Sequence, residues 1–351
     1  MPPEDLFPEA RQRLNQFLQE HFQSESGEMK SVRLAGDASI RQYYRCISPR
    51  GKSYIAVSYP EPIELGSFTY RQIYDLFREI GIPVPATFAM NQALGIVLQE
   101  DLGDELLLNR LEKVGPLKRQ RLLSKAVDYI LRIQAEGSAK FDQNYDAYEL
   151  AFDREKLNWE LRFFGRHYLG GISQAAERVC GGLLEEYDRL AAELADFPRV
   201  LCHRDFQVRN IICAGEVLYV IDFQDARWGP PSYDLASLLK DSIDLDARTV
   251  NLLIEYYLRE SRSRQLPKVS SEVFSEEAFA RQFHLMCIQR LLKALGTYGY
   301  QVSVRQKTVY LQYVKGTLQR VLTSLREIGE FPAVQSMVEE ELSRCDWVSL
   351  G

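Results

Sequence analysis

Apolar residues near the start of the chain recur at the spacing of a helix. Residues 3–22, PEDLFPEARQRLNQFLQEHF, have one apolar face, formed by Leu6, Phe7, Ala10, Leu14, Phe17 and Leu18. The opposite face mixes acidic and basic side chains, whereas a helix that lies on a membrane surface carries a cationic face. We therefore expect this helix to pack against the rest of the protein.

Over residues 31–101 the pattern changes to short runs rich in β-branched and aromatic residues. Five of these runs predict strands, at 31–36, 43–48, 53–59, 86–92 and 94–100. The stretches SPRGK and MNQALG between them carry the Pro, Gly and Asn residues of hairpin turns. A helical pattern over 67–81 interrupts the set. The N-terminal part is therefore predicted to be an antiparallel sheet with one or two helices.

The rest of the chain is predicted to be mostly helical. Strong helical periodicity is found over 117–137, 154–170 and 281–299. The change of pattern falls at LQEDLG, so we expect an N-terminal lobe at 1–98, a hinge at 99–104 and a C-terminal lobe at 105–351. The predicted fold class is α+β and bilobal, with a small antiparallel sheet in the first lobe and a larger helical second lobe.

Composition is that of an ordinary soluble protein. Of 351 residues, 46% are hydrophobic and 26% charged, and this length favours two lobes over one core. The net charge of −6 implies no basic face for nucleic acid. The six cysteines form no Cys-x-x-Cys pair, which favours free thiols in a reducing compartment. With no leader pattern and no apolar run of bilayer length, we expect a cytoplasmic protein without nucleic-acid or membrane partners. The sequence does not indicate the oligomeric state.

Polar residues that suit phosphoryl transfer are grouped after Leu201. The stretch LCHRDFQVRN holds His203, Asp205 and Asn210, and an apolar run at 218–221 then ends on Asp222. In protein kinases, a catalytic-loop aspartate is the base, an asparagine five residues later binds metal, and a second aspartate after a short strand binds metal too. Asp205, Asn210 and Asp222 have the same types, order and spacing. The segments 201–210 and 218–228 are therefore predicted to be the catalytic loop and the metal-binding segment.

A purely structural interpretation of each residue alone is also available. His-x-Asp triplets are common on loops, and an aspartate at the end of a strand often caps the next element. The occurrence of all these positions in one order, after a change from strands to helices, favours the kinase-like interpretation. His203 and Asp234 are expected to be structural supports. Asp234 would accept hydrogen bonds from the catalytic loop or cap the following helix.

The motif CHRDFQVRN…IDFQDARWGPPSYDLASLL resembles the aminoglycoside phosphotransferase and choline kinase superfamily, which has a protein-kinase-like fold. Three further stretches, GDASIRQYYR, LQEDLGDELL and MCIQRLLKALG, are similar to the anomeric kinases of N-acetylmuramate and N-acetylglucosamine, enzymes of cell-wall sugar recycling. The resemblance covers roughly residues 31–300. It implies an ATP-dependent sugar kinase that uses Mg²⁺, two ions being expected, and small-molecule sugar and ATP as its partners.

The resemblance also implies roles for individual residues. Asp205 would be the base, Asn210 and Asp222 the metal ligands, and the backbone of Glu100 and Leu102 the contact with the purine. Nucleotide phosphates would be bound by the segment that holds Gly36, Ser39 and Arg41. One departure stands out: the strand at 53–59 has Val57 and Ser58 where the family carries a phosphate-binding lysine. Arg41 and Arg45 are candidates to replace it, although both would equally suit a solvated strand face.

Candidate sugar-binding residues lie close to the motif. They are Gln207, Arg209, Gln224, Asp225, Arg227 and Trp228, together with Arg290 and Lys293 on the helix at 281–299. Arg227 suits the lactyl carboxylate of N-acetylmuramate, because a guanidinium matches carboxylate geometry. Trp228 would either face the sugar ring or fill the core, the latter being favoured slightly.

Two other functions remain open at this point. The acceptor could be another small hydroxyl compound, such as an amino alcohol, an aminoglycoside or a nucleoside. Alternatively the chain could be a nucleotide-binding pseudokinase that acts as a scaffold, which the missing lysine favours. The presence of Asp205, Asn210 and Asp222 together opposes that second alternative.

Overall fold

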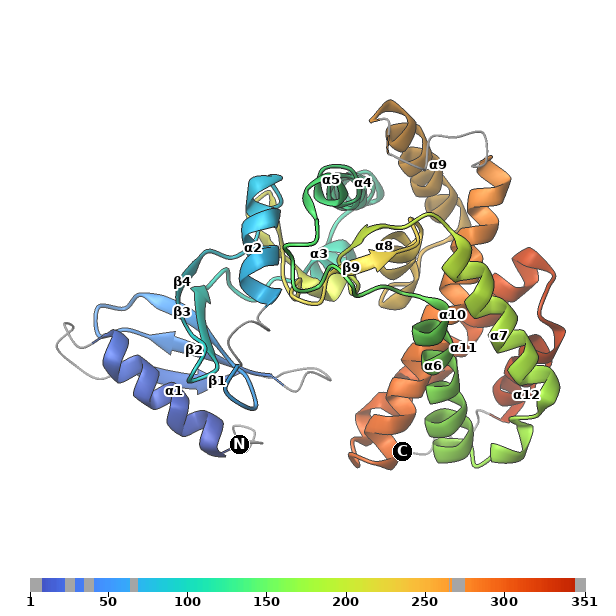
Figure 1. Ribbon diagram of the computed structural model, residues 1–351, viewed down its shortest axis with the longest axis horizontal. Helices are drawn as coiled ribbons and strands as arrows, with labels where there is room; N and C mark the ends of the chain where they lie inside the picture. Colours follow the sequence, from blue (N-terminus) through green and yellow to red (C-terminus); the bar gives the residue numbers. More distant parts are fainter. Residues whose placement is uncertain are drawn as a thin grey trace.

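The computed structural model describes residues 8–22, 29–34, 41–63, 69–264, 266 and 275–344 of the chain. It has the expected α+β architecture, with a small sheet-containing lobe joined to a larger helical lobe (Figure 1). Among the helices that the structure describes, none combines the length and the apolar character required to cross a bilayer.

The N-terminal lobe is a five-stranded antiparallel sheet with two helices. Its strand order is β1-β2-β3-β5-β4. The elements are α1 (Pro8–His21), β1 (Lys30–Arg33), β2 (Gln42–Ile47), β3 (Ser53–Ser58), α2 (Thr69–Glu79), β4 (Thr87–Asn91) and β5 (Ile96–Glu100). The strands predicted from the alternating pattern are therefore confirmed to within a few residues.

Side chains along β3 point alternately to the two faces of the sheet, and each face packs against a different helix. Tyr54 and Ala56 belong to a buried cluster with Leu14 and Phe17 of α1, so the amphipathic first helix covers this face of the sheet. Val57 points the other way and packs with the residues of α2. This second face is the one that looks toward the helical lobe.

The C-terminal lobe is built mainly from helices. They are α3 (Leu107–Lys113), α4 (Pro116–Arg132), α5 (Ser138–Lys140), α6 (Arg154–Phe164), α7 (Gly181–Asp196), α8 (Tyr233–Ala236), α9 (Ala247–Ser263), α10 (Glu276–Ser303), α11 (Val314–Ile328) and α12 (Pro332–Arg344). Shorter helical turns lie at Ile133–Gly137, Gly165–Ile172, Ala176–Arg178, Val208–Asn210, Ser237–Asp241 and Thr308–Tyr313. The five described cysteines are free, and all but Cys180 are buried.

Two small antiparallel ribbons hold the predicted motif. Strand β6 (Val200–Cys202) pairs with β9 (Arg227–Gly229), and β7 (Ile211–Ala214) pairs with β8 (Val217–Val220). The predicted catalytic loop runs from β6 to β7, and the predicted metal-binding segment runs from β8 to β9. Pairing of β6 with β9 and of β7 with β8 therefore fixes both ends of each segment.

Helix α10 is the central packing element of the larger lobe, and much of its circumference is buried. It contacts α6, α11 and the turn at Gly165–Ile172. Gly299 lies against the backbone of that turn, where a Cβ atom would fall far inside van der Waals contact with the carbonyl oxygen of His167. The close approach of the two backbones therefore requires glycine at this position.

We expect Gly299→Ala to lower the free energy of unfolding by about 3 kcal/mol, the upper end of the cost of overpacking a core. Gly316→Ala is the matched control, since it is also helical but its Cβ would meet only the Arg320 side chain at ordinary contact distance. That variant should be neutral or more stable by up to about 1 kcal/mol. Denaturant unfolding of both variants measures the difference, and equal stabilities would contradict the packing described here.

Candidate active site

Asp234 holds the start of the catalytic loop. This buried aspartate, at the beginning of α8, accepts hydrogen bonds from the backbone N–H groups of His203 (2.6 Å) and Arg204 (3.0 Å). Burial raises the pKa of Asp234 to about 7. The two N–H donors and Arg290 favour the ionised form and only partly offset this effect. The contact with the loop is one of the two roles expected for Asp234, and no side-chain cap of α8 is formed.

His203 links the catalytic loop to the metal-binding segment. Its Nε2 lies 3.1 Å from the carbonyl oxygen of Ile221, and its Nδ1 accepts the N–H of Asp205 at 3.3 Å. A carbonyl requires a donor and an N–H requires an acceptor, so the ring is neutral with its proton on Nε2. Burial lowers the pKa of His203, in agreement with a neutral ring.

Arg290 of α10 contacts the backbone of the same loop. The side chain is only 4% exposed. Its terminal nitrogens donate to the Arg204 carbonyl (2.8 Å) and Ser237 Oγ (2.9 Å) and form an ion pair with Asp241. Arg290 was expected to bind substrate. It does line the cavity described below, but its contacts favour a role in positioning the loop.

Asp205 carries a negative charge among three cations. Its carboxylate lies 3.7 Å from Arg204, 3.7 Å from Arg290 and 3.9 Å from Lys293, with 28% of the side chain exposed. Burial alone would raise the pKa of Asp205, but Lys293, Arg204 and Arg290 outweigh that effect and hold it well below its usual range. The group is thus an ionised hydrogen-bond acceptor at physiological pH, suited to orient a hydroxyl.

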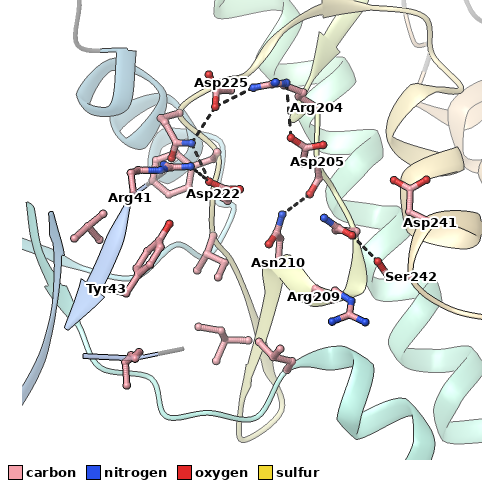
Figure 2. A pocket seen from close by; sticks show the side chains of 18 of the residues that line it. Arg41, Tyr43, Arg204, Asp205, Arg209, Asn210, Asp222, Asp225, Asp241 and Ser242 are labelled. Carbon is pink, nitrogen blue, oxygen red and sulfur yellow. Dashed lines mark hydrogen bonds and ion pairs between the residues drawn. The ribbon is translucent and has the colours of Figure 1, made fainter. Parts of the chain in front are cut away.

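Asn210 and Asp222 line the same cavity as Asp205 (Figure 2). The amide nitrogen of Asn210 donates to the backbone carbonyl of Asp205 (2.9 Å), which leaves the amide oxygen available for a metal ion. Asp222 accepts a hydrogen bond from Gln224 Nε2 (2.9 Å) and forms an ion pair with Arg41. Its φ of 66° lies in the left-handed region, which is uncommon for a residue with a side chain.

These residues border one large cavity between the lobes. Its volume is about 1440 Å³, above the roughly 300–1,000 Å³ typical of a site for one drug-sized ligand. The sheet contributes Tyr43, Ile55, Val57 and Val97, and the predicted hinge contributes Glu100 and Leu102. Two substrates can therefore be accommodated side by side.

Most of the predicted site residues are brought together there. Those that line the cavity are Arg41, Arg45, Glu100, Leu102, Asp205, Gln207, Arg209, Asn210, Asp222, Gln224, Asp225, Arg290 and Lys293. Gly36 and Ser39 lie outside the described residues.

Arg227 and Trp228 are not among the cavity-lining residues. Arg227 Nε donates to the Asp225 carbonyl (3.1 Å), and its guanidinium lies over the ring of Phe152. Trp228 packs edge-on against Phe141 and Tyr148, as expected if it fills the core. Strand β9 therefore turns both side chains away from the cavity wall.

Arg45 reinforces the connection between the lobes. Its guanidinium donates to both oxygens of Asp101, at 2.7 and 3.0 Å, and to both oxygens of Asp104, at 3.0 and 2.7 Å. The arginine thus joins β2 to the predicted hinge. The N–H groups that it donates here all go to the two carboxylates.

Helix α2 packs directly on the metal-binding segment. The hydroxyl of Thr69 donates to the Gln224 carbonyl at 2.6 Å, and the ring of Tyr70 stacks on Phe223 at 5.2 Å. Phe77 contacts the rings of both Phe223 and His203. The position of α2 is therefore coupled to the residue next to Asp222.

The sequence pattern of a family described as the phosphotransferase enzyme family matches residues 31–267. The chain belongs to this family. The phosphotransferase is 31% identical over 271 residues to an N-acetylmuramate/N-acetylglucosamine kinase of Neisseria meningitidis serogroup B, with 76% of each chain covered. It is 28% identical over 333 residues to a kinase of the same name from Pseudomonas aeruginosa, with 91% of this chain and 94% of that one covered.

Solved structures support the fold. An aminoglycoside phosphotransferase in complex with gentamicin matches with a TM-score of 0.60 and 14% identity, over 91% of this chain and 97% of that one. A choline/ethanolamine kinase family protein from Mesorhizobium loti matches with a TM-score of 0.58 and 15% identity, over 97% of this chain and all of that one. At these identities the likeness is one of fold alone.

Several cavity residues of the phosphotransferase were not predicted from the sequence. Tyr298, Tyr310 and Tyr313 contact one another on the wall beyond Asp205. Ser242, also on this wall, donates to the side-chain oxygen of Gln207. These residues come from the loop after α8 and from the last third of the chain. No local pattern there distinguishes them from core or surface residues.

We expect Asp234→Asn to lower kcat about ten- to hundredfold, because one buried N–H of the loop would lose its acceptor, a loss of about 1–3 kcal/mol. Affinity for MgATP should stay nearly the same, since Asp234 contacts only the backbone at the start of the loop. The control is Asp246→Asn, in which asparagine caps α9 as well as aspartate does. Steady-state kinetics and calorimetry check this, and an unchanged kcat would contradict the supporting role of Asp234.

Proposed function

We propose that this phosphotransferase transfers the γ-phosphoryl group of ATP to the anomeric hydroxyl of N-acetylmuramate and N-acetylglucosamine. The observation that carries the proposal is that Asp205, Asn210 and Asp222 line one cavity with room for two substrates. The names of the two bacterial relatives described above support the choice of acceptor.

Asn210 and Asp222 fit the requirements of Mg²⁺. In the part of the chain that the structure describes, no cluster of three or more His, Cys, Asp or Glu side chains could hold a metal ion by itself. One carboxylate and one amide oxygen are nevertheless the protein ligands that Mg²⁺ needs when phosphate oxygens complete its shell. The bound ion would neutralise charge on the nucleotide phosphates. The number of ions, expected to be two, stays a prediction.

Asp205 would orient the acceptor hydroxyl and accept its proton. Its low pKa makes the carboxylate a weak base in the ground state, so proton transfer becomes favourable only as the attacking oxygen forms its bond to phosphorus. Lys293 and Arg290 keep the carboxylate ionised. At the other end of the cavity, the backbone of Glu100 and Leu102 would contact the purine.

The acceptor would bind at the part of the cavity beyond Asp205, which we name the acceptor end. It is lined by Gln207, Arg209, Ser242, Lys293, Tyr313 and Arg320. The guanidinium of Arg209 lies over the ring of Tyr313, with 5.5 Å to the centroid. Because Arg227 is directed elsewhere, Arg209 is the better candidate for the lactyl carboxylate of N-acetylmuramate. The positive side chains here disfavour a polycationic aminoglycoside as acceptor.

The proposed function is tested by measuring ATP consumption against a panel of amino sugars, amino alcohols, aminoglycosides and nucleosides. We expect turnover with N-acetylmuramate and N-acetylglucosamine, and an anomeric phosphate in the NMR spectrum of the product. Asp205→Asn should lower turnover by about 10²–10⁴-fold, the usual contribution of a positioned base. Turnover of another class alone, or no turnover with intact nucleotide binding, would refute the proposal.

Arg209→Met should raise the Michaelis constant for N-acetylmuramate by about ten- to hundredfold, because a hydrogen bond to a charged group contributes about 1.5–3 kcal/mol. The constant for N-acetylglucosamine, which has no carboxylate, should change little. Arg227→Met is the matched control, and any loss should affect both sugars alike. Equal losses for both sugars in Arg209→Met would rule out its role at the carboxylate.

A further inference from the structure

The sheet lacks a lysine at the position where protein kinases bind the nucleotide phosphates. Val57 lines the cavity, whereas the hydroxyl of Ser58 lies on the opposite face, 3.4 Å from the Ala10 carbonyl of α1. Of these two positions, Val57 is therefore the one from which a lysine on β3 would face the cavity. At that position the chain has an uncharged side chain.

Arg41, at the start of β2, brings a positive charge to the same region. Its guanidinium forms an ion pair with Asp222, and the side chain is 13% exposed. It also lies over the ring of Tyr59, with 5.8 Å to the centroid. Figure 2 shows the side chain extending from the sheet to Asp222. The charge thus reaches the metal-binding segment from a neighbouring strand.

Arg45 and Lys52, on or next to the strands β2 and β3, are placed differently. Arg45 lines the cavity, but its fork is used on Asp101 and Asp104. Lys52 lies over the rings of Tyr54 and Phe88, and Tyr54 belongs to the face that α1 covers. Of these three, Arg41 is therefore the one that can act on phosphates near Asp222.

We infer that Arg41 supplies the phosphate-binding charge that a lysine at Val57 would supply, and that it holds Asp222 at the same time. The inference rests on the proposed nucleotide site. A guanidinium has five N–H donors in a fixed plane, so one edge can contact a carboxylate while the other contacts a phosphate. An ammonium group is a single point charge and suits this double role less well.

The test is calorimetric binding of ATP and of adenosine, both without Mg²⁺, so that the metal does not contribute. Arg41→Met should weaken ATP binding about ten- to hundredfold, as expected for loss of a charge-assisted contact. Adenosine binding should stay the same, because adenosine has no phosphates. Adding Val57→Lys to Arg41→Met should recover part of the ATP affinity. Arg45→Met is the matched control, and it should weaken ATP and adenosine alike because it disturbs the hinge.

Three results would overturn the inference. These are unchanged ATP binding in Arg41→Met, equal loss of ATP and adenosine in that variant, or no recovery with Val57→Lys in a double variant of normal melting temperature. If the unaltered protein binds neither ATP nor adenosine, the proposed nucleotide site itself is wrong. The comparison of the two ligands in the unaltered protein thus separates the two failures.

Discussion

The burial of Arg290 beneath the catalytic loop is the constraint on which the active site depends. A guanidinium removed from water requires compensating partners, and here they are Asp241, Ser237 and the carbonyl oxygen of Arg204. The last contact fixes a residue whose φ of 88° is unusual for a residue with a side chain. Since Asp205 follows directly, the direction of its carboxylate is determined by helix α10.

A continuous series of polar contacts joins the two lobes through this loop. It runs from Lys293 to Asp205, Arg204, Asp225, Gln224, Asp222 and finally Arg41. Positive or amide groups alternate with carboxylates along the series, so each carboxylate has a partner on both sides. Substitution of a member inside the series leaves two neighbours incompletely paired, and effects at these positions should not be additive.

The sequence predicted most of the fold and the grouping of Asp205, Asn210 and Asp222 around one cavity, because both have local signals. Alternation gave the strands of the sheet, and helical periodicity gave α10. The spacing of Asp205, Asn210 and Asp222 indicated their chemistry.

The roles of other residues depend on where the fold directs their side chains, and local sequence patterns do not predict that direction. Arg227 is close to Asp222 along the chain, yet β9 turns it toward Phe152. Arg290 was recognised as polar on an apolar helix, but its partners come from two distant segments. Tyr313 and Ser242 reach the cavity only through tertiary packing.

The packing of α2 on Phe223 has a consequence for how such an enzyme is controlled. In protein kinases a lysine on the sheet pairs with a glutamate on the equivalent helix, and movement of that helix switches activity on and off. Here Val57 replaces the lysine, and Thr69 and Tyr70 fasten α2 to the metal-binding segment through a hydrogen bond and a stacked ring. A helix attached in this way cannot swing outward without pulling on Asp222. The rate of such an enzyme would follow the supply of its substrates rather than a movement of this helix.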